Sequence, residues 1–331
     1  GDIIVDDSKF DAVRFDPGRS EQRVDRAYDA PIGALSFNWN SVNVYVRGPS
    51  KDADRANVFL DPENSYVELD NKTKIGGREL NVNVSRVLEK GKEKVIVSGT
   101  VPKDFGEKVF YKGITEPEIW AGENLKSFLS QRGIEVLGKI RKGVSPSNAK
   151  VVAFSEGATI QELVTMMMKF SNNFVAEMLT KCLGSLSKES RVSLSDGIHY
   201  IEKKIKKMGL DPGDFDISSV SGLSQKNRFK AASLWKFQRS LFQDFEFSAD
   251  YVSALPISGR DGTLKSRLKG NGTDGKIKAK TGLLSGVVSL SGFYENEKNE
   301  VNSFVFFYNG KSEPWKVQKF FDDVLANLVR N

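Results

Sequence analysis

The stretch KIKAKTGLLSGVVSLSGF, residues 276–293, predicts two antiparallel strands, at 276–280 and 287–294, joined through a passage of small residues. A third alternating run at 301–308 predicts a neighbouring antiparallel strand. A helical pattern at 315–329 ends the sequence. A terminal helix packed on an antiparallel sheet indicates a mixed α+β fold and not a parallel Rossmann sheet.

The tripeptide Lys280-Thr281-Gly282 lies at the end of the first of these strands. A lysine there can hold a substrate carboxylate, and the neighbouring hydroxyl of Thr281 can hydrogen-bond to the same group. Gly282 has no side chain that would keep a substrate backbone away from the strand edge. Taken alone, the tripeptide is more typical of a plain β-turn, so a functional interpretation needs support from elsewhere in the sequence.

A second polar element, Ser171-Asn172-Asn173, separates two apolar helical stripes. The first helix is expected to open with the capping box at residues 159–162. Because serine and asparagine are both good N-cap residues, the trio alone is explained by a helix break.

The first third of the chain is β-rich. Apolar residues alternate with polar ones in several runs, which predicts antiparallel strands; these residues are Val42, Val44, Val46, Leu80, Val82, Val84, Val95 and Val97. We therefore expect a small β domain at about residues 41–112. An amphipathic helix is expected to follow at 116–132.

Composition excludes several classes of function. The 331 residues suggest about two domains. A formal net charge of +6 without a dense Lys/Arg block argues against nucleic-acid binding, and no apolar run is long enough for a transmembrane helix. The single cysteine, Cys182, and the single histidine, His199, cannot form an intramolecular disulfide or a Cys/His zinc cluster. An acid/base group is therefore expected to be a lysine or a carboxylate. Cys182 is expected in the core and His199 on a helix face.

The two polar elements together form a more specific pattern. A Ser-x-Asn motif followed by Lys-Thr-Gly is two thirds of the active-site signature of penicillin-recognising serine acyl enzymes. Two further segments, SGLSQKN at 221–227 and GRDGTL at 259–264, occur in the same order. With these motifs the chain resembles the D-alanyl-D-alanine carboxypeptidase/endopeptidase family, the low-molecular-mass class C penicillin-binding proteins. The resemblance extends over nearly the whole chain from the opening GDIIVDDSKF.

The resemblance implies a penicillin-binding transpeptidase domain, related to serine β-lactamases. In that family a five-stranded antiparallel sheet is flanked by helices and carries smaller inserted domains. Residues 113–331 would belong to the transpeptidase-like domain, and 41–112 would be an inserted β-rich domain. Residues 1–40 would hold the end of an inserted domain and the return to the main one.

The family also implies roles for individual residues. Ser171 would relay a proton to the leaving amine, and Asn173 would bind the substrate peptide amide. Lys280 and Thr281 would fix the terminal carboxylate of the substrate. The backbone N–H of Leu283 would supply one donor of an oxyanion hole.

The nucleophile of the family is the serine of a Ser-x-x-Lys motif. In the family this motif lies upstream of any residue that matches Asp2 to Phe10, so we expect it to be encoded before Gly1. Four pairs inside the chain fit the bare spacing, and a pattern this loose is expected by chance; they are Ser147/Lys150, Ser185/Lys188, Ser233/Lys236 and Ser266/Lys269.

Three positions bear on the stem peptide that the family's site would take. Gln225 and Ser285 stand where some members carry an arginine and a glutamine that bind the carboxylate end of a diaminopimelate side chain. Asp6, at the family's amine-binding position, is retained. The resemblance therefore implies an amine-bearing stem peptide without the usual clamp on its carboxylate. Asp6 is equally explained as a turn residue at the end of a strand.

The leading hypothesis is a serine DD-peptidase of peptidoglycan that acts through an acyl-enzyme. Its partners would be stem peptides and, as acylating inhibitors, β-lactams; no metal or organic cofactor is expected. Such a substrate implies export to a bacterial periplasm or cell surface. One alternative is a penicillin-binding-like domain that binds cell-wall peptides without turnover. Another is a β-lactamase, against which the β-rich insertion argues.

Overall fold

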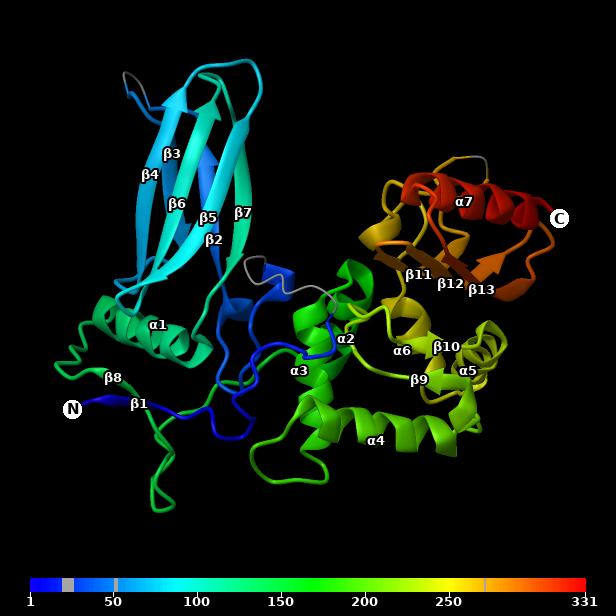
Figure 1. Cartoon of the computed structure of the whole chain (residues 1–331), viewed down its shortest axis with the longest axis horizontal. Helices are drawn as coiled ribbons and strands as arrows, with labels where there is room; N and C mark the ends of the chain where they lie inside the picture. Colours follow the sequence, from blue (N-terminus) through cyan, green and yellow to red (C-terminus); the bar gives the residue numbers. More distant parts are fainter. Residues whose placement is uncertain (20–26, 51–52, 271) are drawn as a thin grey trace. The chain divides into compact units, whose positions relative to one another are not determined.

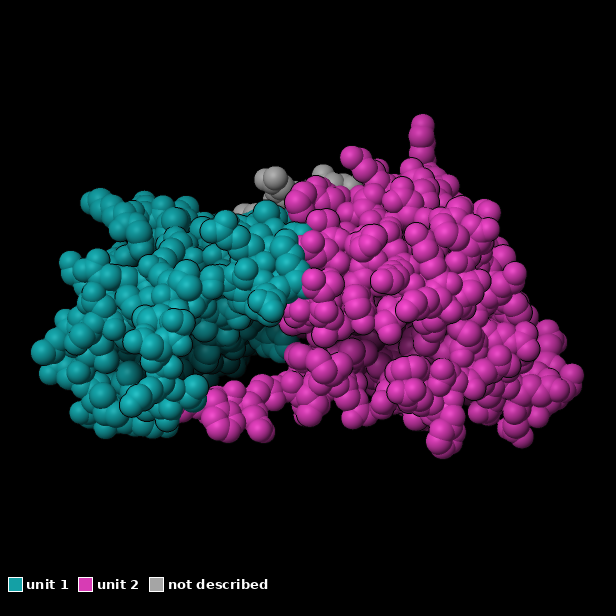
Figure 2. Space-filling view, turned by 90° about the horizontal axis from the view of Figure 1, so that it is seen from below, with its two compact units in different colours: residues 1–15, 22–152, 188–193 teal, residues 16–21, 153–187, 194–331 magenta. Residues whose placement is uncertain are grey.

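A computed structural model describes residues 1–19, 27–50, 53–270 and 272–331. The chain forms two compact units, coloured separately in Figure 2. Unit 1 comprises residues 1–15, 22–152 and 188–193, and unit 2 comprises 16–21, 153–187 and 194–331. Part of the predicted 1–40 segment, residues 20–26, lies outside the described residues.

Unit 2 is built around the sheet that residues 276–308 predict. Strands β11 (Ile277–Leu284), β12 (Val287–Glu295) and β13 (Val301–Asn309) form an antiparallel meander. Helix α7 (Pro314–Arg330) covers one face of this sheet (Figure 1). The core between them contains fully or nearly fully buried side chains, among them Ile277, Ala279, Val288, Leu290, Val317, Phe321 and Leu325. The three predicted strands and the terminal helix are confirmed.

The opposite face of the sheet packs against α5 (Ala231–Gln243) and α6 (Ser248–Ala254). Phe293 of β12 contacts Phe242 and Tyr251, with ring centroids 4.8 Å and 6.1 Å away. Helices therefore flank an antiparallel sheet on both faces, which confirms the expected mixed fold. The sheet has three strands in the described residues, where the resemblance implies five.

Three further helices complete the main elements of unit 2: α2 (Ile160–Phe170), α3 (Asn173–Gly184) and α4 (Leu194–Lys207). Helices α3 and α4 pack closely because Gly197 has no side chain; a Cβ there would lie 2.0 Å from the carbonyl oxygen of Thr180. Cys182 is exposed on α3, so its expected burial is wrong: α3 turns its Phe174 and Val175 face inward instead. Two short strands, β9 (Phe215–Asp216) and β10 (Arg228–Phe229), pair antiparallel to each other.

Within the described residues, the β-rich part of unit 1 has six strands in two three-stranded sheets around one core. The first sheet has the order β3-β2-β7, and the second has the order β4-β6-β5. Their bounds are Ser41–Arg47 (β2), Asn57–Asp61 (β3), Val67–Ile75 (β4), Asn81–Glu89 (β5), Lys92–Val101 (β6) and Glu107–Gly113 (β7). The predicted alternation holds, since Val42, Val44 and Val46 are 0% exposed.

One pairing in unit 1 differs from the expected antiparallel pattern. Strands β4 and β6 pair in parallel, with Val67 opposite Glu93 and Ile75 opposite Val101. The cause is the topology: β5 and β6 form a hairpin, and β4 pairs with β6 on the side away from β5. Period-two patterning reports which face of a strand is buried and carries no information on strand direction.

Helix α1 (Pro117–Gln131) belongs to unit 1 because Trp120 is buried in the β-rich core. The indole of Trp120 donates a hydrogen bond to the carbonyl of Phe37 over 3.2 Å. Strands β1 (Ile3–Val5) and β8 (Ile140–Lys142) pair in parallel beside this helix. The boundaries 1–40, 41–112 and 113–331 stay a prediction.

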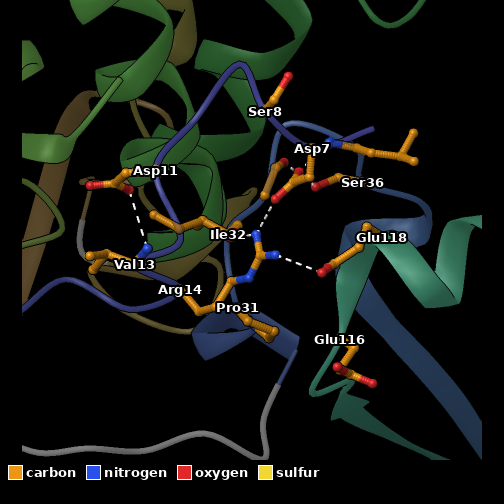
Figure 3. A network of polar contacts seen from close by, with 12 residues as sticks. Asp7, Ser8, Asp11, Val13, Arg14, Pro31, Ile32, Ser36, Glu116 and Glu118 are labelled. Atoms are coloured by element: carbon orange, nitrogen blue, oxygen red, sulfur yellow. Dashed lines mark hydrogen bonds and ion pairs between the residues drawn. The ribbon is translucent and has the colours of Figure 1, made fainter. Parts of the chain in front are cut away.

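A network of charges fixes the first residues of unit 1 to the start of α1 (Figure 3). Arg14 forms ion pairs with Asp7 and with Glu118, the latter over 2.9 Å. Lys142 of β8 contacts both Glu116 and Glu118, over 2.6 Å and 2.9 Å. The Glu118 side chain is only 4% exposed, so these cations balance a buried carboxylate.

Candidate active site

Ser171 lies in the turn between α2 and α3. The capping box predicted for α2 is confirmed, with Thr159 accepting from the N–H of Glu162 and the Glu162 side chain bonding back. Ser171 ends that helix in the left-handed region, at φ 54° and ψ 48°. The side chain of Asn172 then caps α3 by accepting from the N–H of Val175. The trio is therefore a helix break, as its composition suggests, and it places Ser171 at the tip of the break.

Strand β11 brings Lys280 to the same place. Ile277 and Ala279 point into the core beneath α7, so the alternation of the strand turns Lys280 to the other face. The ammonium Nζ of Lys280 donates to Ser171 Oγ over 2.8 Å and to the carbonyl of Thr281 over 2.8 Å. The two motifs, 109 residues apart in sequence, thus meet through one hydrogen bond.

The environment of Lys280 is unusual for a lysine. Burial lowers the pKa of its ammonium from 10.5 to about 8. The partners recorded for it are a hydroxyl and a carbonyl, which are neutral oxygens. A protonated ammonium with neutral partners in a poorly solvated place retains a strong attraction for an incoming anion. A carboxylate is the simplest such anion.

The residues after Lys280 line the edge of β11. Thr281 Oγ1 lies 2.8 Å from Thr263 Oγ1, so its hydroxyl already has a hydrogen-bond partner. A Cβ at Gly282 would lie 2.2 Å from the hydroxyl of Ser289 on β12, which gives this glycine a packing reason in addition to the predicted one. Leu283 is 56% exposed.

Among the described residues, backbone hydrogen bonds cover the first half of the free edge of β11. The carbonyl of Ile277 accepts from the N–H of Ser258, and the N–H of Ala279 donates to the carbonyl of Pro256, both over 2.9 Å. Because backbone groups alternate along a strand, Leu283 faces its N–H to that same side, beyond this cover. The role of this N–H as an oxyanion donor stays a prediction.

Gln225 and Ser285 also lie together. The side-chain amide of Gln225 donates to the carbonyl of Ser285 over 2.9 Å. Both line a pocket with a volume of about 670 Å³, together with Arg228, Phe229 and Phe307. The pocket combines a cation, an amide and two aromatic rings, so it suits a side chain with an apolar stem and a polar end.

The structure also places the two remaining predicted residues, Asn173 and Asp6. Asn173 opens α3 next to Ser171 and is 8% exposed. Asp6 belongs to unit 1, where its carboxylate accepts from the N–H groups of Ser8 and Ser145 over 2.9 Å and 2.7 Å. The hydrogen bond from Ser145 is the largest cause of a lowered pKa for Asp6, to about 2. These contacts match the alternative in which Asp6 holds a turn, and its predicted role in amine binding stays a prediction.

Two residues near the site were not identified from the sequence. Lys169, on the last turn of α2, donates to Asp261 Oδ2 over 2.7 Å and to the carbonyl of Leu255 over 2.6 Å. Two features of the sequence could have drawn attention to these residues. Lys169 is a charged residue on a helix otherwise rich in Met and Leu, two residues before Ser171. Asp261 is the acidic residue of the GRDGTL segment, to which the sequence assigns no structural role.

The internal Ser-x-x-Lys pairs have other partners. Ser185 donates to the carbonyl of Cys182 over 2.7 Å at the end of α3. Ser233 donates to Asp214, and Ser147 belongs to unit 1. Ser266 is exposed. None of these four described hydroxyls is hydrogen-bonded to Ser171 or Lys280.

A Lys-Thr-Gly strand facing a Ser-x-Asn turn, on an antiparallel sheet flanked by helices, defines the structural class of penicillin-binding proteins and serine β-lactamases. Within that class, this chain belongs to the D-Ala-D-Ala carboxypeptidase 3 (S13) family, whose model matches residues 1–328. The predicted family membership is confirmed.

Individual relatives support this assignment. A D-alanyl-D-alanine carboxypeptidase of Actinomadura sp. (strain R39) is 29% identical over 95% of this chain and 60% of the relative. The carboxypeptidase DacB of Haemophilus influenzae is 23% identical over 94% of this chain and 65% of its own length. This chain therefore spans about three fifths to two thirds of the length of these relatives.

Solved structures give the same fold. Penicillin-binding protein 4 (dacB) from Haemophilus influenzae superposes with a TM-score of 0.80 at 20% identity, over 100% of this chain and 75% of that one. A structure of the same protein complexed with a novel β-lactam gives a TM-score of 0.69 at 19% identity, over 90% of this chain and 71% of that one. In the described residues of the chain, no helix has both the length and the apolar character that crossing a membrane requires.

Proposed function

We propose that this chain is the substrate-binding part of a serine DD-peptidase of peptidoglycan, acting on D-alanyl ends or on cross-links between stem peptides. The observation that carries the proposal is the 2.8 Å hydrogen bond between Lys280 Nζ and Ser171 Oγ. It joins a cation suited to a terminal carboxylate with a hydroxyl suited to proton transfer. Family membership over residues 1–328 supports the same chemistry.

The proposed reaction assigns each group a step. Lys280 and Thr281 hold the terminal carboxylate of the peptide, and Asn173 binds its amide. A reactive serine adds to the carbonyl carbon of the D-alanyl bond, while the N–H of Leu283 stabilises the oxyanion. The C–N bond then breaks, and the proton released by the reactive serine passes through the hydroxyl of Ser171 to the departing amine. Water hydrolyses the resulting ester and restores the serine.

The reactive serine is proposed to belong to a Ser-x-x-Lys motif encoded outside residues 1–331. Two facts support this. The chain covers only 60% and 65% of its two carboxypeptidase relatives. The four internal pairs with this spacing are bonded elsewhere, exposed, or part of unit 1.

The pocket beside Ser285 is proposed to take the side chain of the third stem-peptide residue. Gln225 and Arg228 line it, so a polar or anionic end of that side chain would find hydrogen-bond donors there. The donors replace the arginine-and-glutamine clamp that the resemblance implies for some family members. A cell-wall substrate further implies export to a periplasm or cell surface.

The test is the intact mass of the protein expressed from the complete gene, before and after incubation with a penicillin. We expect a covalent adduct that forms far more slowly in Lys280→Met and at an unchanged rate in Lys142→Met, because only Lys280 belongs to the site. Release of D-alanine from a pentapeptide substrate checks turnover.

Two other results would support the alternatives. Reversible binding of stem peptides without any adduct favours a non-catalytic binding domain. Steady-state hydrolysis of penicillin, with fast loss of the adduct, favours a β-lactamase.

A further inference from the structure

The segment GRDGTL, residues 259–264, lies between the two halves of the candidate site. Its residues contact the last turn of α2, which ends at Ser171, and strand β11, which carries Lys280. Residues 262–264 of this segment form a short 3-10 helix, η4. Three separate contacts fix it in place.

The first contact is an ion pair with α2. The Lys169 side chain is 11% exposed, and its ammonium donates to Asp261 Oδ2 over 2.7 Å. The other oxygen of Asp261 accepts from the N–H of Ile257 over 2.8 Å. One carboxylate therefore holds both the helix and the backbone of the loop.

The second contact is steric. Gly262 has φ +54°, and a Cβ built on it would lie 2.5 Å from the carbonyl oxygen of Lys169. The loop backbone therefore lies directly against the backbone of α2. No side chain can be inserted there without moving the end of the helix.

The third contact joins the loop to β11. Thr281 Oγ1 and Thr263 Oγ1 are 2.8 Å apart. Just before the segment, the carbonyl of Pro256 accepts from the N–H of Ala279. The segment and the residues that precede it are thus hydrogen-bonded to the strand on both sides of Lys280.

We propose that Asp261 is a positioning residue that sets the spacing between Ser171 and Lys280 by holding the end of α2 against β11. The hydrogen bond between Ser171 and Lys280 is a single contact to a neutral hydroxyl, and one such bond does not fix two elements in register. The loop supplies an ion pair, a backbone contact and a hydroxyl pair for that purpose. The consequence for catalysis rests on the proposed function.

The hydroxyl pair has a second consequence within this arrangement. A hydroxyl donates one hydrogen bond and accepts others. Thr281 Oγ1 donates to Thr263 Oγ1 over 2.8 Å, so this contact fixes the direction of the Thr281 hydroxyl. Thr263 therefore orients the hydroxyl that the proposed site uses for binding.

The test compares Asp261→Asn with Asp322→Asn in the protein expressed from the complete gene. Asp322 lies on α7, which covers the face of the sheet opposite to Lys280. Its carboxylate forms an ion pair with Arg267 over 2.7 Å. Both variants are expected to lower Tm. Only Asp261→Asn is expected to slow acylation by a penicillin, by roughly tenfold to a hundredfold, because misplacement of reacting groups is costly.

A second readout does not depend on acylation. In protein labelled with ¹³C at lysine Cε, the titration of Lys280 is followed by NMR and assigned with Lys280→Arg. In the wild type its pKa is expected near 8, set by burial. In Asp261→Asn, α2 moves away, water reaches the ammonium, and the pKa is expected to rise toward 10.5. In Asp322→Asn it is expected to stay at the wild-type value.

The outcomes separate the two proposals. If the wild type is not acylated, the proposed function fails, while the NMR titration still tests the positioning role. If Asp261→Asn matches Asp322→Asn in both acylation and titration, the positioning role is overturned. Should Asp261→Asn not fold, Thr263→Val removes only the contact with β11 and is expected to change the same two readouts. Asp261→Glu, which keeps the charge, is expected to restore part of the acylation rate.

Discussion

Two lysines, one in each unit, show how the same side chain is used for opposite purposes. Lys142 lies between Glu116 and Glu118, and although its burial works against the charge, the two carboxylates outweigh that effect and raise its pKa. The Lys280 ammonium donates to a hydroxyl and to a carbonyl, and burial lowers its pKa to about 8. The first charge is balanced within the protein, and the second is left available for an anion from outside.

The difference teaches how a binding site can be recognised among many charged residues. A cation paired with two carboxylates, such as Lys142, is neutralised by them and holds segments of the chain together. A buried cation with no carboxylate among its recorded partners costs stability, and such costs concentrate at functional sites.

The most direct test of the different roles of Lys280 and Lys142 is to replace each lysine with methionine. Lys280→Met is expected to reduce the rate of acylation by roughly 10²–10³, as for the loss of one preorganised electrostatic contact in a transition state. Lys142→Met is expected to leave acylation unchanged and to lower stability, because Glu118 loses one of its cations. Penicillin acylation rates and urea unfolding of both variants check this. Equal losses of acylation in the two would contradict the comparison.

The two lysines should also respond oppositely to pH. The pKa of Lys280 in the folded state is below its ordinary value, so the unfolded chain holds the proton more tightly between about pH 8 and 10.5. Stability relative to Lys280→Met should therefore rise over that range, by roughly 2–3 kcal/mol at one pKa unit per 1.36 kcal/mol. For Lys142 the pKa is raised, so its contribution is full below 10.5 and is lost above that pH. Urea unfolding at pH 7, 10 and 11 measures both signs, and a parallel response of the two would refute the assignment.

Within the unit 1 network, Arg14 pairs with two poorly exposed carboxylates, so its loss should lower the free energy of unfolding most. Arg14→Met leaves Glu118, 4% exposed, and Asp7, 12% exposed, without that partner. Breaking buried pairs of this kind costs about 3 kcal/mol or more. Arg141→Met, which removes a pair with the exposed Asp2, is the control and should change stability far less. Urea midpoints check the ranking, and acylation is expected to be unaffected in both.

The smallest expected effect distinguishes two helix caps. Asn172 caps α3 next to Ser171, and Thr159 caps α2 at its far end. Alanine at either position should cost about 1 kcal/mol of stability. Only Asn172→Ala is expected to slow acylation as well, since it loosens the turn that holds Ser171. Equal acylation by both variants would show that the turn does not depend on its cap.

The sequence was informative where the physics is local. The strands around 276–309 and the capping box at Thr159 follow from alternation and from capping chemistry, and the structure confirms both. The parallel pairing of β4 with β6 was not predictable, because strand direction depends on how the connections run and not on side-chain alternation. The exposure of Cys182 was missed because an apolar helical stretch does not reveal which of its faces turns inward.

The candidate site was also predictable only in part. The meeting of Ser171 with Lys280 was implied by the resemblance, and the structure brings the two together. The contact of Lys169 with Asp261 joins residues 92 positions apart, and the sequence shows a charged residue at each position without showing that the two pair. Long-range ion pairs of this kind are fixed by the fold, so they become visible only when it is known.

The left-handed backbone at Ser171 has a consequence for anyone who tries to make this molecule more robust. A non-glycine residue in that region costs about 1–2 kcal/mol, and glycine would relieve it. A search that rewards thermal resistance alone would therefore favour Ser171→Gly and would remove the hydroxyl that Lys280 contacts. The substitution in this turn that should stabilise the fold most is therefore also the one that should abolish the proposed activity. Stability and activity make opposite demands on residue 171.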